Sequence, residues 1–151
     1  MKLAEALILR ANAQKRMEQL KQRILRNAKV QEGDTPSENP EELLREFESA
    51  ASELIDLMQR INRTNSKTSF QDSSLSDALA KRDVLRMRIS LYRDLAQAAS
   101  ITDSRYSRSE VKFSSAVPVA RIQKEADLLA KEHRELDARI QEANWLVELS
   151  N

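Results

Sequence analysis

The sequence predicts an all-α fold: an antiparallel four-helix bundle with coiled-coil character, in a single helical domain over residues 1–151. The chain has one glycine and three prolines, far below the average usage of about 7% and 5%. Turns and sheets need these residues more than long helices do. Charged residues make up 32% of the chain and aromatic residues 4%, which is typical of long amphipathic helices. A chain of 151 residues is long enough to bury a core of its own.

The first two helices follow from the hydrophobic pattern and from one start signal. The first is expected over residues 2–29. The second begins at Pro40, because Asn39 can cap the helix and the acidic residues that follow favour the positive end of the helix dipole. Two neighbouring apolar stripes make the face of this helix wide enough to contact two partners. The stripes are Leu43, Phe47, Leu54, Leu57 and Ile61, and beside them Leu44, Ala51, Ile55 and Met58.

The third helix is expected to begin at Ser74, in a sequence that resembles a capping box, and the fourth runs from Pro118 to about Leu149. The fourth carries the most regular pattern, in which apolar residues alternate at spacings of three and four over four heptads. Such a seam favours left-handed packing at a shallow angle. Its residues are Val119, Ile122, Ala126, Leu129, His133, Leu136, Ile140, Ala143 and Val147.

The charge of the chain excludes few function classes, but its distribution along the sequence supports an antiparallel order of the helices. The net charge is +1, so no overall field selects nucleic acid or a membrane surface. The net charge alternates along the chain, from +6 over residues 1–30 to −7, +4 and −2 over 31–60, 61–113 and 114–151, which suits sequential antiparallel neighbours. The chain has no cysteine and no apolar run long enough for a transmembrane helix. The start of the chain reads as a helix and not as a signal peptide, so the expected location is cytoplasmic.

Three connections remain between the helices. In the third, Val111, Phe113 and Val117 recur at even spacing, which predicts a strand. We expect a short β-hairpin-like patch at one end of the bundle, between this segment and residues 30–32. The opposite end should collect the 62–74 loop, both termini and Trp145.

The loop Arg105–Lys112 is a candidate nucleic-acid site. Arg105, Arg108 and Lys112 are cations beside Tyr106, and together they could hold phosphate and stack on a base. Asp103 and Glu110 dilute this charge, and no known RNA- or DNA-binding module fits. The alternative is an ordered loop whose arginines pair with the acidic second helix.

The opposite end of the bundle is a candidate small-molecule site. Asn62, Arg63 and Asn65 are expected to lie near Asn144 and Trp145. A polar cluster beside a lone tryptophan could bind a small ligand, and it could equally cap helices and close loops.

No catalytic or metal-binding pattern is recognisable. His133 is the single histidine, and it falls on the apolar seam with Asp137 four residues later. A metal or general-base role would need convergent partners, so we expect a histidine tolerated at the seam, where it could meet its own copy in an oligomer. We expect no cofactor, and the sequence gives no indication of an enzyme.

Several stretches resemble an uncharacterised bacterial family of small helical proteins, often found in actinobacteria. Some members of that family carry the label septicolysin, which implies a pore-forming toxin. The resemblance covers nearly the whole chain and supports the fold, but supplies no known activity. It rests on residues 2–7, 27–33, 61–65, 77–83, 105–110 and 140–145, of which Arg105–Glu110 is the most specific.

The sequence does not identify a function. The leading hypothesis is a non-catalytic interaction or assembly protein that forms a helical homo-oligomer, because wide apolar faces on slender helices exceed what one four-helix core can hide. The first alternative is a nucleic-acid-associated protein that uses the Arg105–Lys112 loop. The second is a small-molecule or enzymatic role at the Asn62/Trp145 end.

Overall fold

The structure, a computed structural model, describes residues 1–101 and 111–151, and the predicted all-α class with a short β-hairpin is confirmed. The described residues form four helices and one two-stranded sheet. None of these helices is long and apolar enough to cross a membrane. The elements are α1 (Leu3–Arg26), α2 (Pro40–Lys67), β1 (Ser69–Phe70), β2 (Ser73–Ser74), α3 (Leu75–Ala99) and α4 (Val119–Leu146).

The chain divides into two compact units. Unit 1 comprises Met1–Leu75 and Gln141–Asn151, and unit 2 comprises Ser76–Ile140. Unit 1 therefore holds α1, α2, the sheet and the end of α4, whereas unit 2 holds nearly all of α3 and most of α4. The prediction of a single domain over residues 1–151 stays a prediction.

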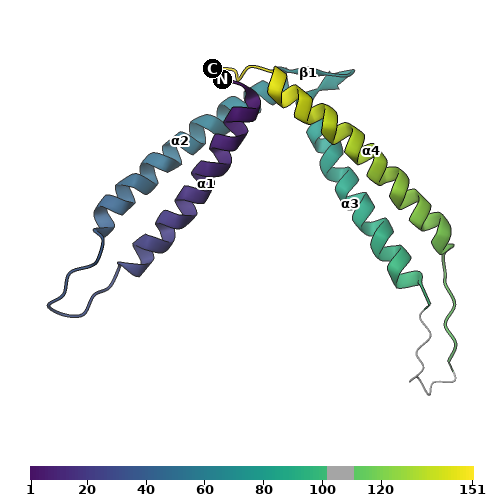
Figure 1. The fold of residues 1–151 in the computed structure, drawn as a ribbon, viewed down its shortest axis with the longest axis horizontal. Helices are drawn as coiled ribbons and strands as arrows, with labels where there is room; N and C mark the ends of the chain where they lie inside the picture. The colour runs from purple at the N-terminus through teal and green to yellow at the C-terminus, as the bar shows by residue number, and fades with distance from the viewer. Residues whose placement is uncertain (102–110) are drawn as a thin grey trace. The chain divides into compact units, whose positions relative to one another are not determined.

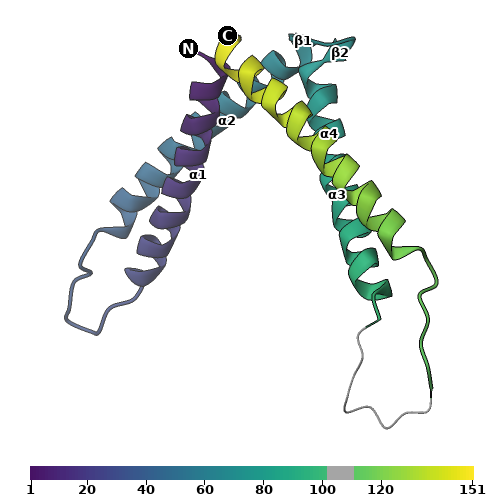
Figure 2. The same cartoon turned by 45° about the vertical axis from the view of Figure 1, so that its right-hand side comes forward.

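In unit 1, α1 and α2 form an antiparallel hairpin and lie side by side in both views (Figures 1 and 2). On each helix a row of buried residues recurs every seven positions, as expected when two helices share one narrow seam, and Leu3, Ala4 and Ile61 are buried beside these rows at the end where the chain begins. The rows are Ala6, Ala13 and Leu20 on α1, and Leu43, Ala50, Leu57 and Thr64 on α2. The predicted start of α2 is confirmed, because the Asn39 side chain accepts a hydrogen bond of 3.0 Å from the Glu41 N–H.

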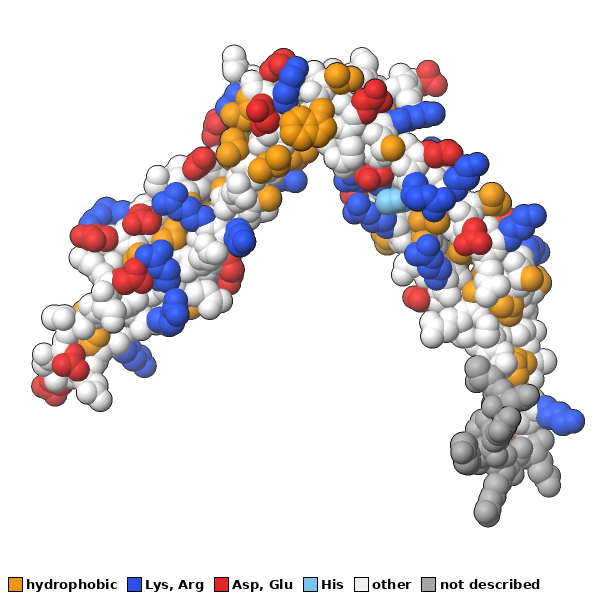
Figure 3. Space-filling model, viewed as in Figure 1, with side chains coloured by type: hydrophobic (Ala, Val, Ile, Leu, Met, Phe, Trp, Pro, Cys, Tyr) orange, Lys and Arg blue, Asp and Glu red, His pale blue; other side chains and the backbone are white. Residues whose placement is uncertain are grey.

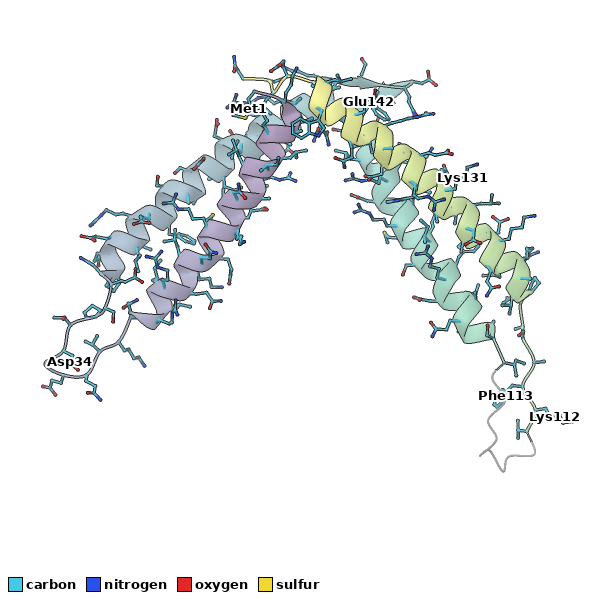
Figure 4. The ribbon with its side chains drawn as sticks, in the orientation of Figure 1. Met1, Asp34, Lys112, Phe113, Lys131 and Glu142 are labelled. Atoms are coloured by element: carbon cyan, nitrogen blue, oxygen red, sulfur yellow. The ribbon has the colours of Figure 1, made fainter. Side chains whose placement is uncertain are left out.

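The connection between α1 and α2 is closed by polar contacts. The Asn27 side chain donates to the Arg23 carbonyl (2.8 Å) and accepts from the Glu38 N–H (3.1 Å). These contacts end α1 at Arg26, three residues before the expected end. Gly33 has a φ of +91°, a left-handed conformation that glycine adopts without steric cost, and the neighbouring Asp34 lies at the tip of the connection (Figure 4).

The expected location of the β-hairpin was wrong. Residues 30–32 and 111–117, which the structure describes, form no strand; β1 and β2 lie between α2 and α3 instead and pair antiparallel, Ser69 with Ser74 and Phe70 with Ser73. A two-residue loop joins them, and Gln71 in this loop has a φ of +53°. The even spacing of Val111, Phe113 and Val117 does not by itself provide a second strand to pair with. The tight turn between β1 and β2 places two short segments side by side, so that they can pair.

In unit 2, α3 and α4 form a second antiparallel hairpin (Figures 1 and 2). The predicted seam of α4 is confirmed within this unit. Ile122, Ala126, Leu129, Leu136 and Ile140 are buried, and His133 is half-buried. The matching residues of α3 are Ala78, Leu85, Ile89 and Ala96.

Candidate functional site

The Arg105–Lys112 loop falls almost entirely outside the described residues. Arg105, Tyr106 and Arg108 belong to residues 102–110, so their prediction stays untested. Lys112 is exposed and lies next to Phe113 in the segment that leads to α4 (Figure 4).

The Asn62/Trp145 end lies in unit 1, where the chain termini meet the end of α2. The Leu3 N–H donates to the Val147 carbonyl (2.9 Å), and the Leu149 N–H donates to the Met1 carbonyl (2.8 Å). The segment after α4 then reaches α2, because the Ser150 N–H donates to the Thr64 hydroxyl (2.9 Å). These bonds bring both termini to residues 62–74, as expected, but the expected loop over these residues was wrong in part, because residues 62–67 form the last turns of α2.

The predicted residues of this end have different environments. Arg63 donates through Nε to the Asn151 carbonyl (3.2 Å), and the neighbouring Arg60 donates to the Ser150 carbonyl (3.1 Å). Asn144 is buried, whereas Asn62 and Trp145 are exposed and Asn65 is half-buried. The arginines of this end are thus hydrogen-bonded to the segment after α4.

Charge at the same end is also balanced within the chain. Lys2 Nζ lies 2.6 Å from one Glu148 oxygen, and the Met1 ammonium lies 3.1 Å from the other. Hydrogen bonds from Lys2, and then from the Met1 ammonium, hold the pKa of Glu148 below its ordinary value. These contacts join the chain termini to the end of α2, and of the predicted site residues Arg63 takes part in them; the choice between the two predicted roles stays open.

Both units expose an apolar stripe on one helix. We name the α2 stripe (Leu44, Ile55 and Met58) and the α3 stripe (Val84, Met87 and Leu91). The exposed fractions of these six side chains run from 41% to 71%. Figure 3 shows hydrophobic side chains reaching the surface of both units on the face that it draws. Because a two-helix hairpin has only one seam, a second stripe on the same helix has nothing inside the hairpin to cover it.

The register of the α3/α4 hairpin is set by polar contacts across it. Arg82 Nη1 donates to Asp137 Oδ1 (2.9 Å), and Lys81 Nζ lies 3.3 Å from Glu132 Oε1. One helical turn along from Arg82, Arg86 Nε donates to His133 Nε2 (3.2 Å). His133 thus faces an arginine of the other helix, whereas its expected neighbour Asp137 pairs with Arg82.

This register builds a basic groove that the sequence did not predict. The groove lies between α3 and α4, has a volume of about 470 Å³ and is open to solvent. Its polar lining residues are Arg86, Ser90, Arg93, Asp94, His133 and Arg134. Figure 3 shows basic side chains on both sides of the single histidine. One feature of the sequence could have indicated this groove: Arg86 and Arg93 are seven residues apart, which places both on one side of a helix.

Comparisons with known proteins agree on an uncharacterised family. A model of a family of unknown function (DUF6847) matches residues 10–149. The crystal structure of a functionally unknown conserved protein from Corynebacterium diphtheriae is similar, with a TM-score of 0.93, 49% sequence identity and coverage of 99% of each chain. A comparison with curated proteins gives no match. The expected membership of an uncharacterised bacterial family is confirmed, and the label septicolysin accompanies neither match. The chain therefore belongs to the family of unknown function DUF6847.

Proposed function

We propose that this chain is a non-catalytic cytoplasmic assembly protein that forms a helical homo-oligomer through its two exposed stripes. The proposal rests on the exposed α2 stripe, which lies beside the buried seam of the same helix. The α3 stripe of unit 2 is exposed in the same way. Burying a large aliphatic side chain stabilises an interface by roughly 1.5–3 kcal/mol when it is fully exposed beforehand. The six residues of the two stripes are 41–71% exposed, so burying each of them contributes about half of that amount, and together they offset part of the cost of association.

Charge complementarity indicates a second copy of the chain as the partner. From Leu44 to Met58, the segment that carries the α2 stripe has four acidic residues and one basic residue. From Lys81 to Arg93, the segment that carries the α3 stripe has five basic residues and one acidic residue. In a two-fold symmetric dimer, α2 of each copy can pack on α3 of the other, so that both stripes are buried and both charge patterns are matched.

The test is the mass in solution of variants that place a charge in one stripe. Ile55→Glu and Leu91→Glu should each weaken association by at least about tenfold, because an unpaired carboxylate would be buried in the interface. Ser49→Glu is the matched control, since Ser49 is exposed and lies on the far side of α2 from the stripe. Multi-angle light scattering across a concentration series measures the effect. Equal association of Ile55→Glu and Ser49→Glu would contradict the proposal.

A charge exchange tests the pairing of the two stripes. Glu48 flanks the α2 stripe and Arg88 flanks the α3 stripe. Glu48→Lys alone and Arg88→Glu alone should each weaken association about two- to fivefold, the range of an exposed ion pair. A mixture of the two variants should recover wild-type association, because both contacts of the mixed dimer then join opposite charges. A mixture as weak as the single variants would show that these stripes do not meet.

The two alternatives gain no support from the described residues. The nucleic-acid hypothesis rests on Arg105, Tyr106 and Arg108, which lie outside them. At the Asn62/Trp145 end, Arg63 is hydrogen-bonded to Asn151. We do not extend the septicolysin label, or the pore-forming activity that it implies, to this chain.

A further inference from the structure

The basic groove of unit 2 differs from the rest of that hairpin in its charge balance. Lys81 and Arg82 have carboxylate partners on α4 at 3.3 Å and 2.9 Å. Among the residues that the structure describes, neither Arg93 nor Arg134 has a carboxylate within 4.0 Å, and Arg86 reaches Asp83 only at 4.0 Å. Three guanidinium groups from two helices therefore line one groove, with Asp94 as the single acidic lining residue.

Arginine side chains in this arrangement suit an oxyanion. The planar guanidinium offers parallel N–H donors that match the oxygens of phosphate or carboxylate, and it stays charged at any physiological pH. Arg86, Arg93 and Arg134 are exposed, so their guanidinium groups are accessible to an anionic ligand that enters the groove. The groove volume of about 470 Å³ lies in the range of small-molecule sites.

His133 holds one of these arginines in place. Its Nε2 accepts a hydrogen bond of 3.2 Å from Arg86 Nε, which requires a neutral imidazole with its proton on Nδ1. The bond uses Nε of Arg86 and leaves its two terminal nitrogens for a ligand. His133 is therefore a positioning residue, and this explains why a histidine occupies an otherwise apolar seam.

The spacing of the arginines favours an extended anion over a single small one. Arg86 and Arg93 are seven residues apart on α3, about 10 Å along the helix axis, and Arg134 approaches from α4. We propose that this groove binds a small molecule that carries a chain of two or more phosphoryl groups. The shared chemistry is the linked phosphate; free pyrophosphate and a nucleoside triphosphate are its two sources.

Calorimetric titration of the full chain tests the proposal, with pyrophosphate, ATP and inorganic phosphate as separate probes. Pyrophosphate or ATP should bind at micromolar to millimolar concentrations, and inorganic phosphate more weakly. Tighter binding of ATP than of pyrophosphate would identify a nucleotide as the source, whereas equal binding would identify the phosphates alone. No binding of either at millimolar concentration would overturn the proposal.

Variants decide whether the groove is the site. Arg93→Gln and Arg134→Gln should each weaken binding about tenfold, the loss expected for one charge-assisted contact. Arg139→Gln is the matched control, because Arg139 is exposed on α4 and does not line the groove. Equal losses in all three variants would indicate a diffuse charge effect and would overturn the site. Binding of single-stranded DNA that needs Arg93 and Arg134, without binding of pyrophosphate or ATP, would replace the small molecule by nucleic acid.

The role of His133 has its own readout. His133→Leu removes the acceptor for Arg86 and should weaken binding several-fold, whereas His133→Gln keeps an acceptor oxygen and should bind nearly as the wild type does. Both variants should retain the helical circular dichroism of the wild type. Equal binding by the leucine variant and the wild type would show that Arg86 needs no positioning by His133.

Discussion

The two helical hairpins use arginine differently. In unit 1, Arg23 binds Glu38 at one end of the α1/α2 hairpin, and Arg60 and Arg63 bind the segment after α4 at the other. In unit 2, Arg82 is paired across the hairpin, while Arg93 and Arg134 have no carboxylate partner within the described residues. Arg23, Arg60 and Arg63 thus hold the ends of the unit 1 hairpin, whereas Arg93 and Arg134 line a groove of unit 2. Composition and spacing do not show which arginines have a partner. The residue that faces each arginine in the folded structure decides this.

The largest effect should come from breaking the pair that sets the register of unit 2. The side chain of Arg82 is 18% exposed and that of Asp137 is 35% exposed, and Arg82 Nε is buried without a hydrogen-bond partner among the described atoms. Asp137→Ala should lower the free energy of unfolding by about 2 kcal/mol, because it leaves a largely buried guanidinium unpaired. Urea unfolding measures the change.

Arg82→Met is the contrasting variant for the same pair. It removes the buried cation together with its unsatisfied Nε and keeps an unbranched side chain of similar reach. Its cost should therefore be less than half that of Asp137→Ala, since carboxylate Asp137 is the more exposed partner. If Arg82→Met were as costly as Asp137→Ala, the pair itself, and not the burial of an unpaired charge, would stabilise the register.

A smaller effect is expected from the bond that ties the segment after α4 to α2. The Thr64 side chain is 1% exposed, donates to the Arg60 carbonyl (2.8 Å) and accepts from the Ser150 N–H (2.9 Å). Thr64→Val should cost about 1 kcal/mol, because it leaves the Ser150 N–H without its partner. Amide hydrogen exchange of Ser150 should accelerate.

Thr68→Val is the matched control for this bond. Within the described part of the chain the Thr68 hydroxyl bonds to the Thr64 carbonyl (2.7 Å) and not to Ser150, so its loss should leave the exchange of Ser150 unchanged. Faster Ser150 exchange in both variants would mean that the end of α2 frays as a whole.

The smallest expected effect is a local loss of stability at acid pH in unit 1. Hydrogen bonding from Arg23 holds the pKa of Glu38 below its ordinary value of 4.5. A carboxyl whose pKa is lower in the folded state favours folding above its ordinary pKa, and this contribution is lost as the pH falls through the lower folded value. Glu38→Gln should reduce the acid dependence of hydrogen exchange in residues 27–39. If the acid dependence of exchange were the same in this variant as in the wild type, the Arg23–Glu38 pair would not be the cause of the acid sensitivity.

Local signals were predictable from the sequence, and long-range pairing was not. The start of α2 depends on Asn39, Pro40 and the acidic residues next to them, and the seam of α4 depends on spacing within one helix, so both predictions were confirmed. The strands of two residues each are too short for any periodicity. The turn at Gln71 carries no glycine, so no turn signal in the sequence indicated a hairpin there.

The basic groove could not be predicted because it depends on the register of α3 against α4. That register places His133 beside Arg86, a relation between residues 47 positions apart. The Asn62/Trp145 end was predictable as a location, since an antiparallel order brings the termini to the end of α2. The bonds of Arg60 and Arg63 to the segment after α4 needed the folded structure.

The mass of the wild-type chain in solution, measured by light scattering with absorbance at 260 and 280 nm, tests the assembly proposal most directly. The proposal predicts at least twice the monomer mass of 17.3 kDa, without nucleic-acid absorbance. A mass of 17.3 kDa at every concentration up to the millimolar range would contradict it and would leave the two stripes without a partner of the same kind.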